Sequence, residues 1–144
     1  MTEAKQSSPQ IWLSEPPAIG HTASQEVTVE IHLTALAVGS GSLEVLATPM
    51  MVALMEKAAC STLEGFLAPG WTSVGTKLDI THSAASPLGA AIVATAKLTN
   101  ISDRSLDFEL TASDNSGPIG SGTHSRFLVF SDKFMAKTKS RIKP

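Results

Sequence analysis

Apolar and polar residues alternate along most of the second half of the chain. Residues 73–86, 89–102, 105–114 and 118–130 show the period of two that is typical of half-buried strands. They are rich in Ile, Val, Leu and Thr, and short segments containing Ser, Pro, Gly or Asp separate them. Since short connections join antiparallel neighbours, the pattern predicts an antiparallel meander of four strands.

The first half of the chain predicts less regular structure. Residues 25–33 alternate in the same way and predict one more strand, followed by a loop at residues 37–42. Residues 1–20 are rich in Ser, Pro and Glu and predict a loosely ordered lead-in, with residues 11–13 docking on the body. We therefore expect residues 21–144 to form a single domain that ends in a short basic tail, which forms a short helix.

A long apolar segment between these regions predicts a buried helix. Thr48 is a good N-cap residue and Pro49 suits the first helical position, while the Pro and Gly of residues 67–71 end the helix. One strand, one buried helix and four antiparallel strands predict an α+β protein of the hot-dog fold, a curved sheet of about five strands wrapped around a central helix. One sheet leaves its edges uncovered, so we expect two copies to pair as a homodimer.

Charge and cysteine content exclude several classes of protein. The formal charge of −2 argues against a nucleic-acid partner, and no apolar segment is long enough to span a membrane. The single cysteine, Cys60, cannot form an intramolecular disulfide, and its small apolar neighbours predict a buried thiol in a reducing compartment. We expect a cytoplasmic protein. No His and carboxylate cluster has metal-ligand spacing, so no metal site is predicted.

Glu56 is the unusual residue of the predicted helix. Helical spacing places it on a stripe with apolar residues, where an isolated charge is very costly. One interpretation is structural: Glu56 reaches solvent at the helix edge or pairs with a strand lysine such as Lys77. The other is that Glu56 is a functional carboxylate.

Thr48 and His82 are the candidate companions of Glu56. Eight residues of helix separate the Cα atoms of Thr48 and Glu56 by about 12 Å, so a third group has to bridge part of that gap. The alternation of residues 78–82 directs His82 toward the helix. A capping role for Thr48 and a core role for His82 are the structural alternatives. His124 could lie on the same sheet, but the sequence shows no carboxylate partner for it.

Three stretches together resemble a known family. They are ATPMMVALMEKAAC, SVGTKLDITHSAASPLG and IGSGTHSRFLVFSDKFMAK. They are similar to the fluoroacetyl-CoA thioesterase family of hot-dog enzymes, which hydrolyse short acyl-CoA thioesters, and the similarity runs from about residue 46 to residue 137. The resemblance implies that an acyl-CoA is the substrate and that no cofactor is needed.

The resemblance also implies roles for five residues. Thr48, Glu56 and His82 match the family's catalytic threonine, glutamate and histidine, while Gly75 and Arg126 match residues that bind substrate. Two routes use these groups: Glu56 acts as a general base on water, or Glu56 or Thr48 attacks the carbonyl and forms an acyl-enzyme. The sequence leaves both routes open, and it leaves open whether His82 serves the Glu56 of its own chain or that of a partner.

One segment departs from the family pattern. Residues 33–46 contain no Phe or Tyr, whereas the family is rich in aromatic and proline residues there. We therefore expect hydrolysis of a short-chain acyl-CoA without carrying over selectivity for fluorine. A non-catalytic protein that binds acyl-CoA or a small ligand is the alternative. A hot-dog hydratase is disfavoured, since its Asp-x-Asn-x-x-His motif does not occur here.

Overall fold

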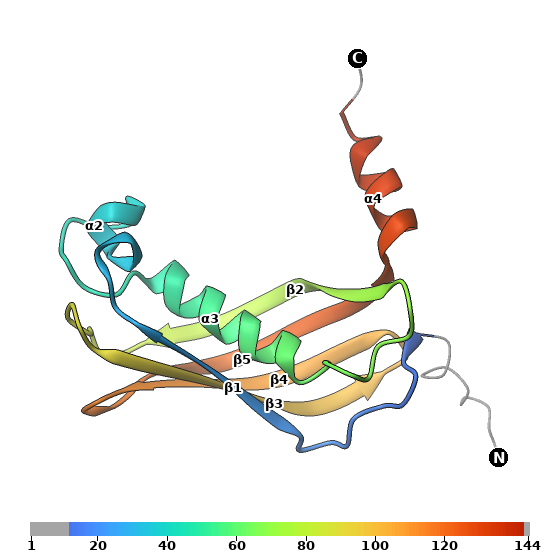
Figure 1. The fold of residues 1–144 in the computed structure, drawn as a ribbon, viewed down its shortest axis with the longest axis horizontal. Helices are drawn as coiled ribbons and strands as arrows, with labels where there is room; N and C mark the ends of the chain where they lie inside the picture. The colour runs from blue at the N-terminus through green and yellow to red at the C-terminus, as the bar shows by residue number, and fades with distance from the viewer. Residues whose placement is uncertain (1–11, 143–144) are drawn as a thin grey trace.

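A computed structural model of the chain describes residues 12–142. A five-stranded antiparallel sheet curves around one long helix, and a shorter helix follows the last strand (Figure 1). The elements in chain order are β1 Thr22–Thr28, the 3-10 turn η1 Ile31–Leu33, α2 Ala35–Val38, α3 Thr48–Ser61, β2 Trp71–His82, β3 Ala91–Ser102, β4 Ser105–Asp114, β5 Gly117–Phe130 and α4 Ser131–Lys139.

The strand order β1-β3-β4-β5-β2 confirms the expected five strands but corrects the meander. Strands β3, β4 and β5 are consecutive neighbours, whereas β2 pairs with β5 at one edge and β3 lies beside β1 at the other. The link between β2 and β3 is therefore a crossover rather than a hairpin turn. It bonds to the segment before α3 instead of folding back on itself: Leu46 N donates to Ser86 O at 2.9 Å.

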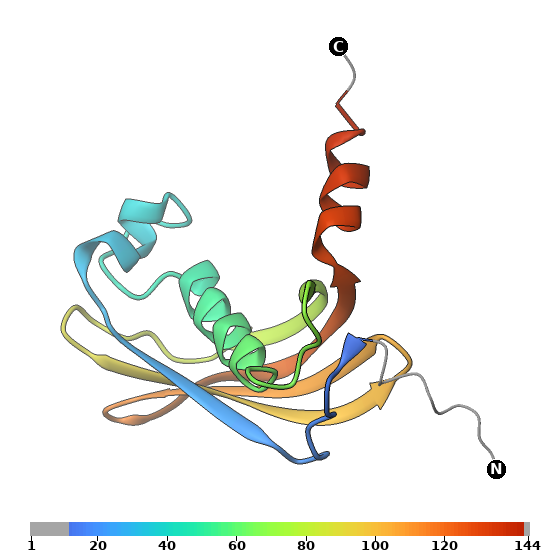
Figure 2. The same ribbon diagram turned by 45° about the vertical axis from the view of Figure 1, so that its right-hand side comes forward.

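Helix α3 fills the concave face of the sheet (Figures 1 and 2). Met51 and Met55 are fully buried, and small side chains beneath them at Ala94 and Ala96 of β3 let the helix approach closely. Strand β3 alternates between buried and more exposed residues, as expected for a strand with one face in the core. The α+β hot-dog architecture predicted from the sequence is thus the one observed.

Three local expectations were wrong. The first strand ends at Thr28, and Ile31 lies in a 3-10 turn with 66% of its surface exposed instead of pointing inward. The predicted loop at residues 37–42 begins within a short helix, because the Thr34 side chain accepts a hydrogen bond from Ala37 N and caps it. Cys60 is exposed, because it lies on the side of α3 that faces away from the sheet.

The two ends of the described chain differ in how they pack against the sheet: the first residues are buried, and the last helix is not. Trp12 and Leu13 are buried in the core, as expected for a docking segment, while Ile11 lies outside the described residues. Helix α4 forms as predicted and stands away from the sheet at the end of β5, with no buried residue (Figure 2). No helix among residues 12–142 is long and apolar enough to cross a membrane.

Candidate active site

Thr48 and His82 form a direct pair. Thr48 Oγ1 lies 2.7 Å from His82 Nδ1, which joins the beginning of α3 to the end of β2. Thr48 is the first residue of the helix and Ala47 is the N-cap, so the expected capping role of Thr48 was wrong: its hydroxyl bonds the imidazole instead. The other ring nitrogen, His82 Nε2, is buried and has no hydrogen-bond partner in the described chain.

Arg126 forms the centre of a second polar group. Its guanidinium donates to Ser73 Oγ at 2.8 Å and to Ser73 O at 3.0 Å. It also donates to His124 Nε2 at 3.2 Å, and it lies 3.5 Å from Glu56 Oε2. Arg126 is only 6% exposed, so this buried cation depends on these acceptors. Glu56 therefore pairs with an arginine of β5 rather than with Lys77, and 36% of its side chain is exposed at the edge of the helix.

His124 is the residue of this group that the sequence reasoning set aside. Its Nδ1 lies 2.7 Å from Lys77 O, which can only accept a hydrogen bond, so Nδ1 carries the proton. Nε2 is then free to accept from Arg126. Burial lowers the pKa of His124, an effect that the bond to Lys77 O opposes. His124 is therefore neutral near pH 7 and positions the guanidinium. The strand alternation that places residues 124 and 126 on one face could have revealed this pair.

A β-bulge aligns the two groups on one face of β2. In a regular strand, Gly75 and His82 would point to opposite faces because seven residues separate them. The register shifts between Gly75 and Lys77, so Thr76 is an extra residue. A Cβ atom at Gly75 would lie 2.8 Å from Glu56 Oε2, while His82 reaches Thr48, so both residues face α3. Periodicity alone did not predict this bulge.

The five predicted residues thus fall into two groups within one chain. Thr48 and His82 form one, whereas Glu56, Gly75 and Arg126 form the other together with His124. Among the described residues, no hydrogen bond or ion pair joins Glu56 to His82. The imidazole of His82 does not bridge Thr48 to the Glu56 of the same chain in the way the helix spacing suggested. In residues 12–142, no group of three His, Cys, Asp or Glu residues could hold a metal ion.

A small cavity adjoins the Thr48–His82 pair. Its volume is about 290 Å³, and its wall comes from the segment that runs from α2 to the beginning of α3 and from the end of β2 with the residues that follow it. Besides Thr48 and His82, the lining consists largely of small side chains, among them Ala35, Ala84 and Ala85. This volume is at the lower end for ligand pockets, so the cavity suits a small group.

Comparison with known proteins identifies the class first. The fold matches a hot-dog-like protein from Thermanaerovibrio acidaminovorans with a TM-score of 0.79, at 21% identity over 88% of this chain and 93% of that one. This match defines the fold alone.

The family follows from closer matches. The model of the fluoroacetyl-CoA-specific thioesterase family matches residues 27–132. The fluoroacetyl-CoA thioesterase of Streptantibioticus cattleyicolor is 41% identical over 98 residues, which cover 68% of this chain and 70% of that protein. A point mutant of the fluoroacetyl-CoA-specific thioesterase, solved in complex with fluoroacetate and CoA, matches with a TM-score of 0.78 and 34% identity over 81% of this chain and 98% of that one. The chain belongs to this thioesterase family, and the expectation of an acyl-CoA thioesterase is confirmed.

Proposed function

We propose that the protein hydrolyses a short-chain acyl-CoA to a carboxylic acid and coenzyme A, with Thr48, Glu56 and His82 as its catalytic residues. The observation that carries this proposal is the 2.7 Å contact between Thr48 Oγ1 and His82 Nδ1. A hydroxyl bonded to an imidazole is the usual arrangement of a nucleophile and its base. The buried and unpartnered His82 Nε2 supports it, because such an atom needs a partner that the described part of one chain does not supply.

The size of the acyl group follows from the cavity beside this pair. Its volume of about 290 Å³ and its lining of alanine and serine side chains suit an acyl chain of a few carbons. Fluoroacetyl-CoA is the substrate in the names of the related proteins. For this chain we propose a broader short-chain acyl-CoA, because no aromatic side chain lines the cavity among the described residues.

A homodimer would complete the site. Strand β2 is a sheet edge, and its residues 76–79 are exposed, so one row of its backbone groups is free to pair with another strand. Antiparallel pairing of two β2 strands around a two-fold axis at Asp79 pairs Leu78 with Ile80 and, across the bulge, sets Gly75 and Thr76 opposite His82 of the partner subunit. The Glu56–Arg126 group of one subunit would then face the Thr48–His82 pair of the other.

This arrangement gives each residue a chemical role. Arg126 and backbone N–H groups near Gly75 stabilise the negative charge that develops on the thioester oxygen. Gly75 leaves open the space that a side chain would fill, since a Cβ there would lie 2.8 Å from Glu56 Oε2. Glu56 activates water or attacks the carbonyl carbon, or Thr48 attacks it with His82 as base. When Thr48 attacks, His82 takes the hydroxyl proton and delivers it to the departing thiolate of coenzyme A; when Glu56 activates water, the proton that Glu56 removes goes to the thiolate. An acyl-enzyme formed on Thr48 or Glu56 is released as the carboxylic acid by a water molecule, and when Glu56 is the nucleophile the thiolate takes its proton from solvent. No cofactor takes part in either route.

We also propose a cytoplasmic location. The support is chemical: Cys60 is an exposed thiol, and free exposed thiols are characteristic of reducing compartments.

The first test measures multiple-turnover release of coenzyme A from acetyl-, fluoroacetyl-, propionyl-, butyryl- and longer acyl-CoAs. We expect turnover of the short chains by the wild type, and a loss of about 10²- to 10⁴-fold in Glu56→Gln, the range for a group that transfers protons. Lys57→Gln is the control, because it lies beside Glu56 but is exposed. Equal rates for wild type and Glu56→Gln would contradict the assignment of Glu56.

The second test asks which chain supplies each group. Glu56→Gln and His82→Ala subunits, each inactive alone, are unfolded and refolded together. A site shared between subunits is intact once in each mixed dimer, so random pairing restores about a quarter of the wild-type activity. As a control, Thr48→Ala mixed with His82→Ala restores nothing, because Thr48 and His82 act from the same chain. No recovery in the first mixture would refute the shared site.

A further inference from the structure

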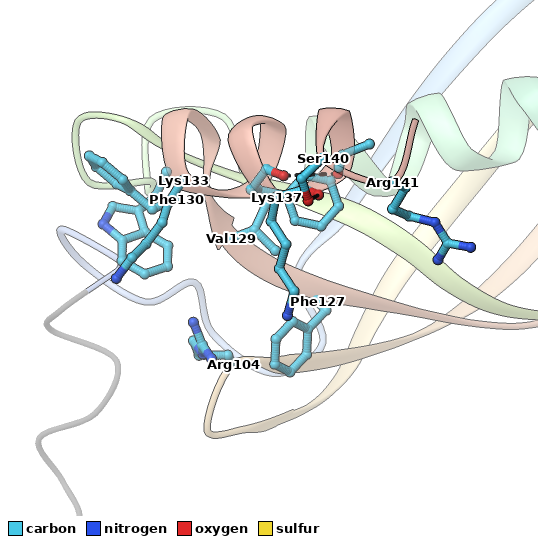
Figure 3. Close-up of a pocket in the computed structure, with 11 residues that line it drawn as sticks. Arg104, Phe127, Val129, Phe130, Lys133, Lys137, Ser140 and Arg141 are labelled. Atoms are coloured by element: carbon cyan, nitrogen blue, oxygen red, sulfur yellow. Dashed lines mark hydrogen bonds between the residues drawn. The ribbon is translucent and has the colours of Figure 1, made fainter. Parts of the chain in front are cut away.

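A second cavity lies away from both polar groups of the site. It is a groove of about 800 Å³ between α4, the end of β5 and the turn between β3 and β4 (Figure 3). Four cations line it, and no carboxylate does so among the described residues. These cations are Arg104, Lys133, Lys137 and Arg141. We call this cavity the α4 groove.

Aromatic rings accompany the cations. Trp71, Phe127, Phe130 and Phe134 line the same groove, and Trp71 and Phe130 pack edge to face with their centroids 5.6 Å apart. In Figure 3, Lys137 extends from the helix toward the Phe127 ring, and Lys133 lies beside Phe130 at the other end. The Arg104 guanidinium lies 5.0 Å from the Phe127 centroid, so the ring orients this cation. Phosphate charges and a flat heteroaromatic base are the two chemistries that such a surface binds.

The groove also lies within reach of the site. Trp71 lines the groove at the beginning of β2, and Gly75 lies four residues further along the same strand, about 13 Å away at about 3.3 Å per residue. The extended pantetheine arm of coenzyme A bridges a distance of this order between its thiol and its nucleotide. A substrate whose thioester lies at Gly75 can therefore place its phosphates and adenine at α4.

We propose that the α4 groove binds the 3′-phosphorylated adenosine diphosphate end of the acyl-CoA substrate. The lysines and arginines of the groove bind the phosphates, and the exposed rings of Phe130 and Phe134 stack on the adenine. This inference rests on the proposed function for the choice of ligand. It also explains why α4, which buries no residue of its own, carries both basic and aromatic side chains.

The test compares two charge reversals on one helix. Lys137 lines the groove, whereas Lys139 lies on α4 without lining it, and both belong to its last turn. We expect Lys137→Glu to raise KM for acyl-CoA about tenfold, the size of one charge-assisted contact, with kcat unchanged. Lys139→Glu should leave KM unchanged. Neither variant should alter the hydrolysis of the matching acyl-pantetheine thioester, which lacks the nucleotide.

Direct binding separates this proposal from the proposed function. Calorimetry with adenosine 3′,5′-bisphosphate should show saturable binding to wild type and Lys139→Glu and weaker binding to Lys137→Glu, whether or not any thioester is hydrolysed. The proposal is overturned if the bisphosphate does not bind, if the two variants behave alike, or if acyl-pantetheine suffers as much as acyl-CoA. It is also overturned if Lys137→Glu changes the oligomeric mass by light scattering and leaves bisphosphate binding intact, since α4 then contacts a second copy.

Discussion

The two polar groups beneath α3 differ in how completely their atoms are bonded. In the first, Arg126 donates to Ser73, His124 and Glu56, and His124 uses both of its ring nitrogens. In the second, His82 uses one ring nitrogen, and its buried Nε2 has no partner in the described chain. Buried polar atoms are normally satisfied, so the difference marks the Arg126 group as complete within one subunit and the Thr48–His82 pair as open to substrate or to a second subunit.

Replacement of His82 should have the largest effect on activity and little effect on stability. His82→Ala removes one hydrogen bond of a half-buried side chain, but it also removes the proposed base. We expect kcat to fall about 10²- to 10⁴-fold, with a melting temperature close to that of the wild type. Steady-state release of coenzyme A and thermal unfolding measure the two quantities. Thr48→Ser retains the hydroxyl and should keep most of the activity. A His82→Ala enzyme that retains full turnover would remove the Thr48–His82 pair from the mechanism.

Replacement of Arg126, unlike that of His82, should have a large effect on stability. Arg126→Met leaves His124 Nε2 and Ser73 O without their donor in a buried place, and we expect it to lower the free energy of unfolding by about 3 kcal/mol. Little of this loss comes from Glu56, whose side chain is 36% exposed and therefore screened by solvent. Chemical denaturation provides the measurement. Arg104→Met is the control, since its cation–π contacts are worth about 1 kcal/mol. Equal losses in both variants would show that the buried network contributes nothing specific.

The sequence predicts these two groups unequally for a physical reason. Periodicity predicts α3, the four later strands and the inward direction of His82, because each depends on a repeated pattern of local residues. The bulge at Thr76 is a single inserted residue, and the pairing of β2 with β5 depends on a crossover, so neither leaves a periodic signal. His124 acquires its role through Lys77 O and Arg126, contacts that exist only after β2 and β5 pair.

Replacement of Gly75 should have a smaller effect on both stability and activity, because it displaces only the Glu56 carboxylate. A Cβ in Gly75→Ala would lie 2.8 Å from Glu56 Oε2 and 3.2 Å from His124 Cε1, so the carboxylate has to move. Glu56 is partly exposed and can shift at low cost, which predicts a loss of unfolding free energy of only about 1 kcal/mol. The displaced carboxylate should lower kcat/KM about 10- to 100-fold. Thr76→Ala, next along the strand, is the control for activity. A Gly75→Ala enzyme with unchanged kcat/KM would place the acyl group elsewhere.

The neutral state of His124 predicts the smallest effect, a dependence of stability on pH. Because burial lowers the pKa of His124 below 6.5, the unfolded chain takes up a proton at this residue before the native state does. Unfolding free energy should therefore fall as the pH drops below about 6.5, by at most about 1.4 kcal/mol per unit, until the native residue is protonated as well.

The variant His124→Gln can accept a hydrogen bond from Arg126 but does not titrate, so it should lose this part of the pH dependence while folding at pH 7. His32→Gln is the matched control, since the His32 side chain is 72% exposed and should leave the slope unchanged. Denaturation series between pH 5 and pH 8 compare the three proteins. Equal slopes in wild type and His124→Gln would mean that the pKa of His124 is the same in the native and unfolded states. Burial in the Arg126 group would then not favour the neutral imidazole, and the hydrogen bond from Arg126 to its Nε2 would not set the protonation state of His124.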